Sequence, residues 1–146
     1  MLKILIAVDG SEHANRAIEA VGNMVRSSLE LEACLICVIP GAIMDPVFSA
    51  DYSAVTIQKI EEEQKCRQDT VLDQATGLSK AQGLRLSEPV RAYGVIANEI
   101  VRVANERQVD QIAMGTRGMG AISSVFLGSV AQRVIHQASM PVLLAK

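Results

Sequence analysis

The chain reads Met114-Gly115-Thr116-Arg117-Gly118-Met119-Gly120 near its C-terminus, at the end of the segment Val109-Asp110-Gln111-Ile112-Ala113-Met114. That segment predicts a buried strand. Around Gly128-Ser129, apolar residues recur at helical spacing: Leu127, Val130, Ala131, Val134, Ile135 and Ala138. Parallel α/β sheets bind ligands outside the carboxyl ends of their strands. A glycine loop between a strand and a helix therefore predicts both the fold class and a binding site.

The glycines of this loop predict contact with an anion such as phosphate. Glycine has no Cβ, so its backbone can adopt positive φ, approach a ligand closely and turn successive N–H groups toward one point. Gly128-Ser129 adds the unpaired N–H groups of a helix start and a hydroxyl donor, and Arg117 adds a cation. The alternative is that the glycines between positions 115 and 120 only shape a long turn, because a few glycines are weak evidence by themselves.

The composition is typical of one globular domain over residues 1–146. Apolar residues make up 49% of the chain and charged residues 21%, and this length is sufficient for a hydrophobic core without disulfides. The net charge of -2 argues against a nucleic-acid partner or an anionic membrane, because both bind basic faces. No apolar run reaches the roughly 20 residues of a membrane span, and no signal peptide is evident. We therefore expect a cytoplasmic protein without membrane insertion.

Strands and helices alternate along the chain, which predicts an α/β fold with a doubly wound, five-stranded parallel sheet. The expected strands are 3–8, 32–39, 84–92, 109–114 and 141–145. The expected helices run from Ser11 to about Ser28, from Val55 to Ala81, from Gly94 to about Arg107, and through the segment after Gly128. Residues 41–53 lack periodicity and predict either a surface loop or a segment that folds over a ligand.

Asp9 ends the first expected strand, where a side chain contributes little to packing. A carboxylate at this place can cap the following helix, or it can meet a ribose hydroxyl or a bound cation, and the residues alone leave both interpretations open. His13 lies on the outer face of that helix and is expected to be solvated. The polar run from Glu61 to Asp69 likewise predicts a solvated helix face.

Two of the three cysteines form the pattern Cys34-Leu35-Ile36-Cys37. In a strand, residues three apart point to opposite faces, so these thiols are expected to fill the core rather than to bind a metal or form a redox pair. Cys66 lies in the polar helix segment and has no expected role. An odd number of cysteines in a chain without an export signal indicates reduced thiols.

The spacing Gly115-x2-Gly118-x9-Gly128-Ser129 resembles the ATP-binding signature of the universal stress protein family. The string Val8-Asp9-Gly10-Ser11 is similar to a loop of that family that lines the nucleotide site, and the resemblance extends over nearly the whole chain. It implies a Rossmann-like, adenine-nucleotide-binding three-layer sandwich with strand order 3-2-1-4-5.

The resemblance also implies which residues bind ATP, with Mg2+ as its companion. Adenine would rest near Ala7, Val8 and Val38, with backbone groups of Val38 at its edge, and Asp9 would meet the ribose or a metal ion. The ribose and the phosphates would be wrapped by Met114, Gly115, Arg117, Gly118, Gly128, Ser129 and Val130.

The function that the resemblance implies is that of a nucleotide-responsive regulator of stress tolerance or of a partner protein. The chain has no G-x-x-x-x-G-K-[ST] loop and no evident general base, so no catalytic residue is expected. A slow ATPase and a nucleotide-free interaction protein are the alternatives. In the implied strand order the last strand, with Val142, Leu143 and Leu144, lies at the sheet edge. We therefore expect a homodimer formed by antiparallel pairing of this strand with its copy.

Overall fold

The computed structural model describes residues 1–27, 30–41, 53–118 and 127–146, and these form one parallel sheet flanked by helices. No helix in this part of the chain is both long and apolar enough to cross a membrane. The elements in chain order are β1 (Leu2–Ala7), α1 (Glu12–Arg26), β2 (Leu31–Pro40), α3 (Ala54–Ala81), β3 (Arg85–Leu86), β4 (Val90–Gly94), α4 (Ile96–Glu106), β5 (Gln111–Gly115), α5 (Ser129–Gln137) and β6 (Val142–Ala145).

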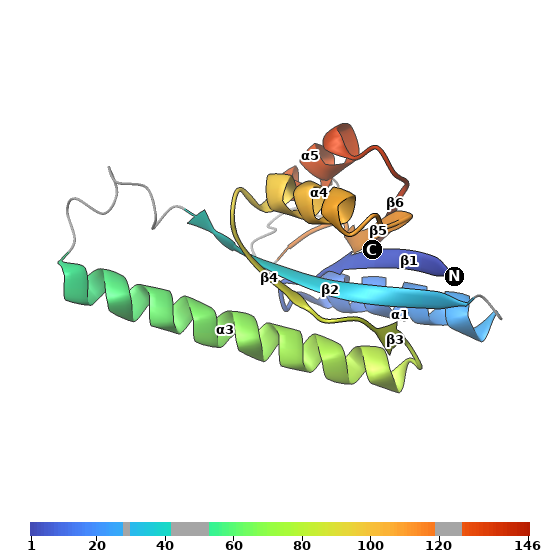
Figure 1. The fold of residues 1–146 in the computed structure, drawn as a ribbon, viewed down its shortest axis with the longest axis horizontal. Coiled ribbons are helices and arrows are strands. Elements are labelled where there is room, and N and C mark those ends of the chain that lie inside the picture. The colour runs from blue at the N-terminus through green and yellow to red at the C-terminus, as the bar shows by residue number, and fades with distance from the viewer. Residues whose placement is uncertain (28–29, 42–52, 119–126) are drawn as a thin grey trace.

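Helices cover both faces of the sheet, with α1 and α3 on one side and α4 and α5 on the other (Figure 1). Side chains of β1 alternate between two hydrophobic clusters. Ile4 and Ile6 pack with α1 and α3, whereas Leu5 packs with α4 and α5. All three are fully buried, because helices shield both faces of a parallel sheet. The expected three-layer α/β sandwich is confirmed.

The strands are arranged in the order β3-β2-β1-β5-β6, and β4 also pairs with β2. This is the expected order 3-2-1-4-5 with one correction: the third strand, expected over residues 84–92, consists of two segments. β3 pairs with the start of β2 and β4 with its end. Pro89 lies between them and has no N–H to donate to the ladder, so strand pairing is interrupted there.

Two serines begin helices in the structure. The Ser11 hydroxyl accepts a hydrogen bond from the Ala14 N–H at 3.2 Å, and Ser53 caps α3 in the same way through Thr56 at 3.3 Å. A side-chain oxygen at the N-cap satisfies an N–H group that has no partner within the helix. Helix α1 ends at Arg26. The expected end at Ser28 and residues 42–52 of the loop expected over 41–53 lie outside the described residues.

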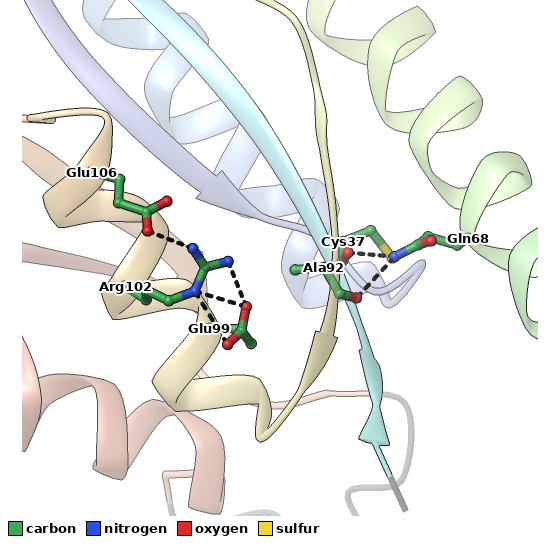
Figure 2. A network of polar contacts seen from close by, with 6 residues as sticks. All are labelled: Cys37, Gln68, Ala92, Glu99, Arg102 and Glu106. Atoms are coloured by element: carbon green, nitrogen blue, oxygen red, sulfur yellow. Dashed lines mark hydrogen bonds and ion pairs between the residues drawn. The ribbon is translucent and has the colours of Figure 1, made fainter. Parts of the chain in front are cut away.

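The polar face expected over Glu61–Asp69 contains one buried residue, so this prediction is wrong for Gln68. Its side chain is only 1% exposed. Its Nε2 donates to the carbonyl oxygens of Cys37 at 2.7 Å and of Ala92 at 3.2 Å (Figure 2). Gln68 therefore fastens α3 to two neighbouring strands, β2 and β4. It shares a helix face with Leu72 and Ala75, which are also buried.

The thiols of Cys34 and Cys37 lie on opposite faces of β2, as expected. Cys34 packs with α4, whereas Cys37 packs with α1 and α3. Burial raises the pKa of both thiols, and for Cys37 burial followed by the negative charge of Asp9 raises the pKa to about 11. Both thiols are therefore neutral at pH 7, which suits residues that fill a core.

Candidate functional site

The central strand β1 stops before its neighbour β2. The last residue of β1, Ala7, pairs with Ile36, and the Val8 N–H still donates to the Ile36 carbonyl oxygen at 2.9 Å. Beyond this point β2 continues to Pro40 and pairs only with β4 among the described strands. Residues on one strand direct their backbone groups to alternate sides, so Val38, like Ile36, directs its N–H and C=O toward the β1 side. There the strand partner is missing.

A cavity of about 380 Å³ lies beyond the end of β1, within the range of small-molecule sites. All eleven residues of the expected nucleotide site line it: Ala7, Val8, Asp9, Val38, Met114, Gly115, Arg117, Gly118, Gly128, Ser129 and Val130. They come from the ends of β1, β2 and β5 and from the start of α5. The structure therefore brings the expected residues together at the place where strand order reverses, between β1 and β5. That they bind a nucleotide stays a prediction.

The sequence analysis missed six further lining residues: Ala14, Ile36, Ile96, Ile100, Thr116 and Ala131. Ile36 and Ile100 are almost fully buried and belong to the same hydrophobic cluster. Such residues carry no sequence signal that separates a cavity wall from ordinary core, because both require the same apolar periodicity. Five of the six are apolar, so they add apolar surface to the cavity.

Asp9 lies in the turn before α1 and lines the cavity, whereas Ser11 is the N-cap of that helix. That Asp9 meets a ribose hydroxyl or a cation stays a prediction. The Asp9 Oδ1 accepts a hydrogen bond from the Ser11 N–H at 2.9 Å, which stabilises the turn into α1. Gly10, between them, has φ +82°, a conformation that favours glycine. The same carboxylate lines the cavity, where Asp9 and Arg117 are the charged residues among the described lining. The described lining therefore carries one negative and one positive side chain.

The positive φ expected for the loop glycines is wrong at the described positions, whereas their close approach to a ligand stays a prediction. Positive φ occurs at Gly10, Gly83 and Gly94, and at none of the signature glycines that the structure describes. A Cβ at Gly115 would instead lie 2.7 Å from the His13 Cβ, so this glycine allows α1 to pack closely on β5. Gly120, the remaining glycine of the loop, lies outside the described residues.

Gly128 likewise permits a close approach of backbone. Its N–H donates to the Thr116 carbonyl oxygen at 2.8 Å. A Cβ at Gly128 would lie 3.2 Å from the same oxygen. The contact joins the start of α5 to the end of β5, and the Thr116 N–H in turn donates to the Ala145 carbonyl oxygen at 2.8 Å. Through these two hydrogen bonds, Thr116 links Gly128 at the cavity to Ala145 in the edge strand β6.

His13 is half-buried, so its expected position in solvent is wrong. The first turn of α1 packs directly on Gly115, and this contact draws His13 toward the sheet. Its Nδ1 is buried without a hydrogen-bond partner among the described residues. Helical periodicity predicted an exposed His13 because the periodicity depends on the helix sequence alone. It carries no information on how closely the neighbouring strand approaches the helix.

Two helices begin at the cavity without a side-chain cap. The N-cap residues of α4 and α5 are Val95 and Gly128, and neither helix receives a capping side-chain bond within the described part of the chain. Ile96 at the start of α4 and Ser129 at the start of α5 both line the cavity. Uncapped N–H groups and the positive end of the helix dipole favour an anionic ligand. The capped helices α1 and α3 differ in this respect.

A divalent cation would find a single carboxylate in this lining. No cluster of three or more His, Cys, Asp or Glu side chains suited to a metal ion occurs among residues 1–27, 30–41, 53–118 and 127–146. Magnesium is commonly held by one or two carboxylates together with substrate phosphates. The donor set therefore fits an ion that arrives with a phosphate ligand, with Asp9 as its protein contact.

Known proteins resemble this chain over its whole length. Residues 1–146 match the model of the universal stress protein family. A universal stress protein of Thermus aquaticus is 31% identical over 98% of this chain and 97% of its own length.

Solved structures share the fold. The protein MJ0577 of Methanocaldococcus jannaschii is 28% identical, with a TM-score of 0.74 over 99% of this chain and 95% of that one. A universal stress protein of Archaeoglobus fulgidus, solved in complex with dAMP, has a TM-score of 0.72 and 21% identity over 100% of this chain and 98% of its own. With its sheet order, its cavity at the end of β1 and a family match over every residue, the chain belongs to the universal stress protein family.

Proposed function

We propose that this protein binds ATP, together with Mg2+, and acts as a nucleotide-responsive regulator. The observation that carries the proposal is the convergence of three strand ends and an uncapped helix start on one cavity. The complex of the Archaeoglobus fulgidus relative with dAMP supports an adenine nucleotide as the ligand class. The lining combines apolar side chains, which suit a base, with Asp9, Arg117 and the start of α5, which suit a polar or charged group.

Each part of the nucleotide has a proposed contact. The base lies against Ala7 and Val8, with its polar edge toward the backbone N–H and C=O of Val38. The ribose hydroxyls donate to Asp9. The phosphates lie at the start of α5, where backbone N–H groups and the Ser129 hydroxyl donate to them and Arg117 supplies positive charge.

The cavity favours binding over rapid hydrolysis. Its described lining contains one carboxylate, Asp9, and neither His nor Lys. One Asp9 oxygen already accepts the Ser11 N–H, and the other is the proposed acceptor for the ribose hydroxyls, away from the phosphates at the start of α5. General-base catalysis requires a group within hydrogen-bond reach of the attacking water. We therefore place this protein with nucleotide sensors rather than with efficient ATPases.

Titration calorimetry with ATP, AMP and adenosine tests the proposal. We expect all three to bind, with ATP the tightest. Ser129→Ala should weaken ATP binding about tenfold, because a hydrogen bond to a charged phosphate is lost, and should leave adenosine binding unchanged. Ser53→Ala, which removes a helix cap outside the cavity, is the matched control. Absence of binding at millimolar nucleotide would refute the function, and rapid phosphate release from ATP would refute the sensor role.

We also propose a homodimer through β6. Pro141 and Ala145 direct their carbonyl oxygens to β5, where they accept the N–H groups of Ile112 and Thr116. The alternate residues Val142 and Leu144 therefore direct their backbone groups away from β5. Beyond them no strand of the described residues pairs with β6. An exposed row of unpaired backbone groups favours pairing with a second copy.

Leu144→Pro should convert the dimer into a monomer, because proline removes an outward N–H while the β5 ladder keeps its bonds. Light scattering coupled to size-exclusion chromatography measures the mass. Leu144→Ala is the control, since it shortens the side chain and keeps the N–H, and it should remain dimeric. A wild-type chain that elutes as a monomer at high concentration would exclude this assembly.

A further inference from the structure

The carboxylate of Asp9 reaches across the cavity to the loop that follows β5. Its Oδ1 is fixed by the Ser11 N–H. Its Oδ2 lies beside the α-carbon of Gly118, where a Cβ would come within 2.7 Å of that oxygen and 4.0 Å of the Asp9 Cγ. Real Cβ atoms essentially never approach an oxygen so closely. The space that a side chain at position 118 requires is thus already occupied by Asp9.

Gly118 differs in this respect from the other signature glycines. A Cβ at Gly115 would meet the backbone of α1, and a Cβ at Gly128 would meet the carbonyl of Thr116. At Gly118 the only described atoms within 4 Å belong to the Asp9 carboxylate. Its conformation is not the reason for glycine either, because its φ is not positive. The requirement for glycine at 118 therefore comes from one side chain.

We propose that Gly118 is a positioning residue for Asp9. Because glycine has no side chain, the Asp9 carboxylate can occupy the space beside the Gly118 α-carbon, and from there it accepts hydrogen bonds from the hydroxyls of a ligand. The ribose part of this statement rests on the proposed function, whereas the steric part does not. A residue with a Cβ at position 118 pushes the Asp9 carboxylate aside. Of the two parts of the ligand that the loop is expected to wrap, the ribose and the phosphates, recognition of the ribose is then the part that is weakened.

The steric part is tested by thermal unfolding without nucleotide. Gly118→Ala should lower Tm by about 3 °C, because the Asp9 carboxylate moves aside only by weakening its hydrogen bond with the Ser11 N–H. The same change in an Asp9→Ala background should lower Tm by less than about 1 °C, because the carboxylate is gone. In an Asp9→Asn background the full loss should persist, because asparagine has the shape of aspartate. Equal losses in all three backgrounds would overturn the proposal, as would no loss in the wild-type background.

The ligand part is tested by binding of ATP and of 2′,3′-dideoxy-ATP, which lacks the sugar hydroxyls. The wild-type protein should prefer ATP about tenfold, and Gly118→Ala should abolish this preference while it binds the dideoxy compound as the wild type does. Gly128→Ala is the matched control, expected to weaken both ligands equally. A Gly118→Ala protein that keeps the preference would overturn the proposal.

Failure of the proposed function gives a different pattern. If neither nucleotide binds the wild-type protein, the ATP-binding proposal is refuted. The Tm values of the Gly118 and Asp9 variants then still decide whether Gly118 positions Asp9. If both nucleotides bind and the coupling in Tm is absent, the positioning role falls and the function stands.

Discussion

Gly115→Ala is expected to lower the free energy of unfolding by about 3 kcal/mol. The new Cβ would lie 2.7 Å from the Cβ of His13, 2.8 Å from its carbonyl carbon and 3.0 Å from the nitrogen of Ala14. Two of these atoms are backbone, so they move only if the first turn of α1 moves. That turn leads into Ala17 and Ile18, which are fully buried against the sheet. Urea denaturation followed by circular dichroism measures the loss.

Gly77→Ala is the matched control for this substitution. Gly77 lies inside α3, and a Cβ there would meet nothing within 4 Å. Alanine should therefore stabilise the protein by about 0.5–1 kcal/mol, because glycine in a helix interior loses more conformational freedom on folding. The same chemical change is thus expected to have opposite signs at the two positions. A Gly115→Ala protein with wild-type stability would show that α1 does not lie so close to β5.

Gln68→Glu is expected to destabilise the protein by about 4 kcal/mol at pH 7, because it buries a charge without a partner. The Gln68 amide nitrogen donates to two carbonyl oxygens, and the side chain is almost fully buried (Figure 2). A carboxylate in its place would present oxygen to oxygen. Burial and both carbonyls therefore raise the folded-state pKa of the new carboxyl above its unfolded value of about 4.3.

The pH dependence of this loss has a definite sign. Below the unfolded pKa the carboxyl is protonated in both states, so the loss from charge is absent. It grows as the pH rises through the unfolded pKa, because only the unfolded chain ionises readily, and it levels off above the folded pKa. Gln68→Met is the control, with a loss of about 1 kcal/mol that does not change with pH. Urea titrations between pH 4 and pH 8 compare the two variants. An equal loss for Gln68→Glu across this range would contradict the burial of position 68.

Much of the architecture follows from patterns that are local in sequence. The apolar run of β1 and the helical spacing in α1 predict a buried parallel strand and a helix on its face, and both are present. Ser11 is recognisable as a cap because its role depends only on the next three residues. The divided third strand was missed, although Pro89 carried the signal for it.

The resemblance to the universal stress protein family supplied eleven of the residues that line the cavity, but six others and the structural reasons for the glycines were not predicted. The residues that line the cavity lie at strand ends and at a helix start, which sequence patterns can locate. Their contacts are between segments far apart in the chain, as with Gly118 and Asp9 or Gly115 and His13. Gln68 illustrates the same limit, because its burial depends on two strands that a helix pattern does not describe.

The early end of β1 also decides which molecules the cavity rejects. Where a longer strand would continue, the N–H and C=O of Val38 have no strand partner among the described residues, and we expect water to bind them. A purely apolar guest would expel that water and leave a donor and an acceptor with no partner, at a cost of about 1–3 kcal/mol for each. A flat guest with its own donor and acceptor on one edge escapes this penalty. The gap in the sheet therefore disfavours purely apolar molecules of suitable size, independently of their contacts with Asp9 or Arg117.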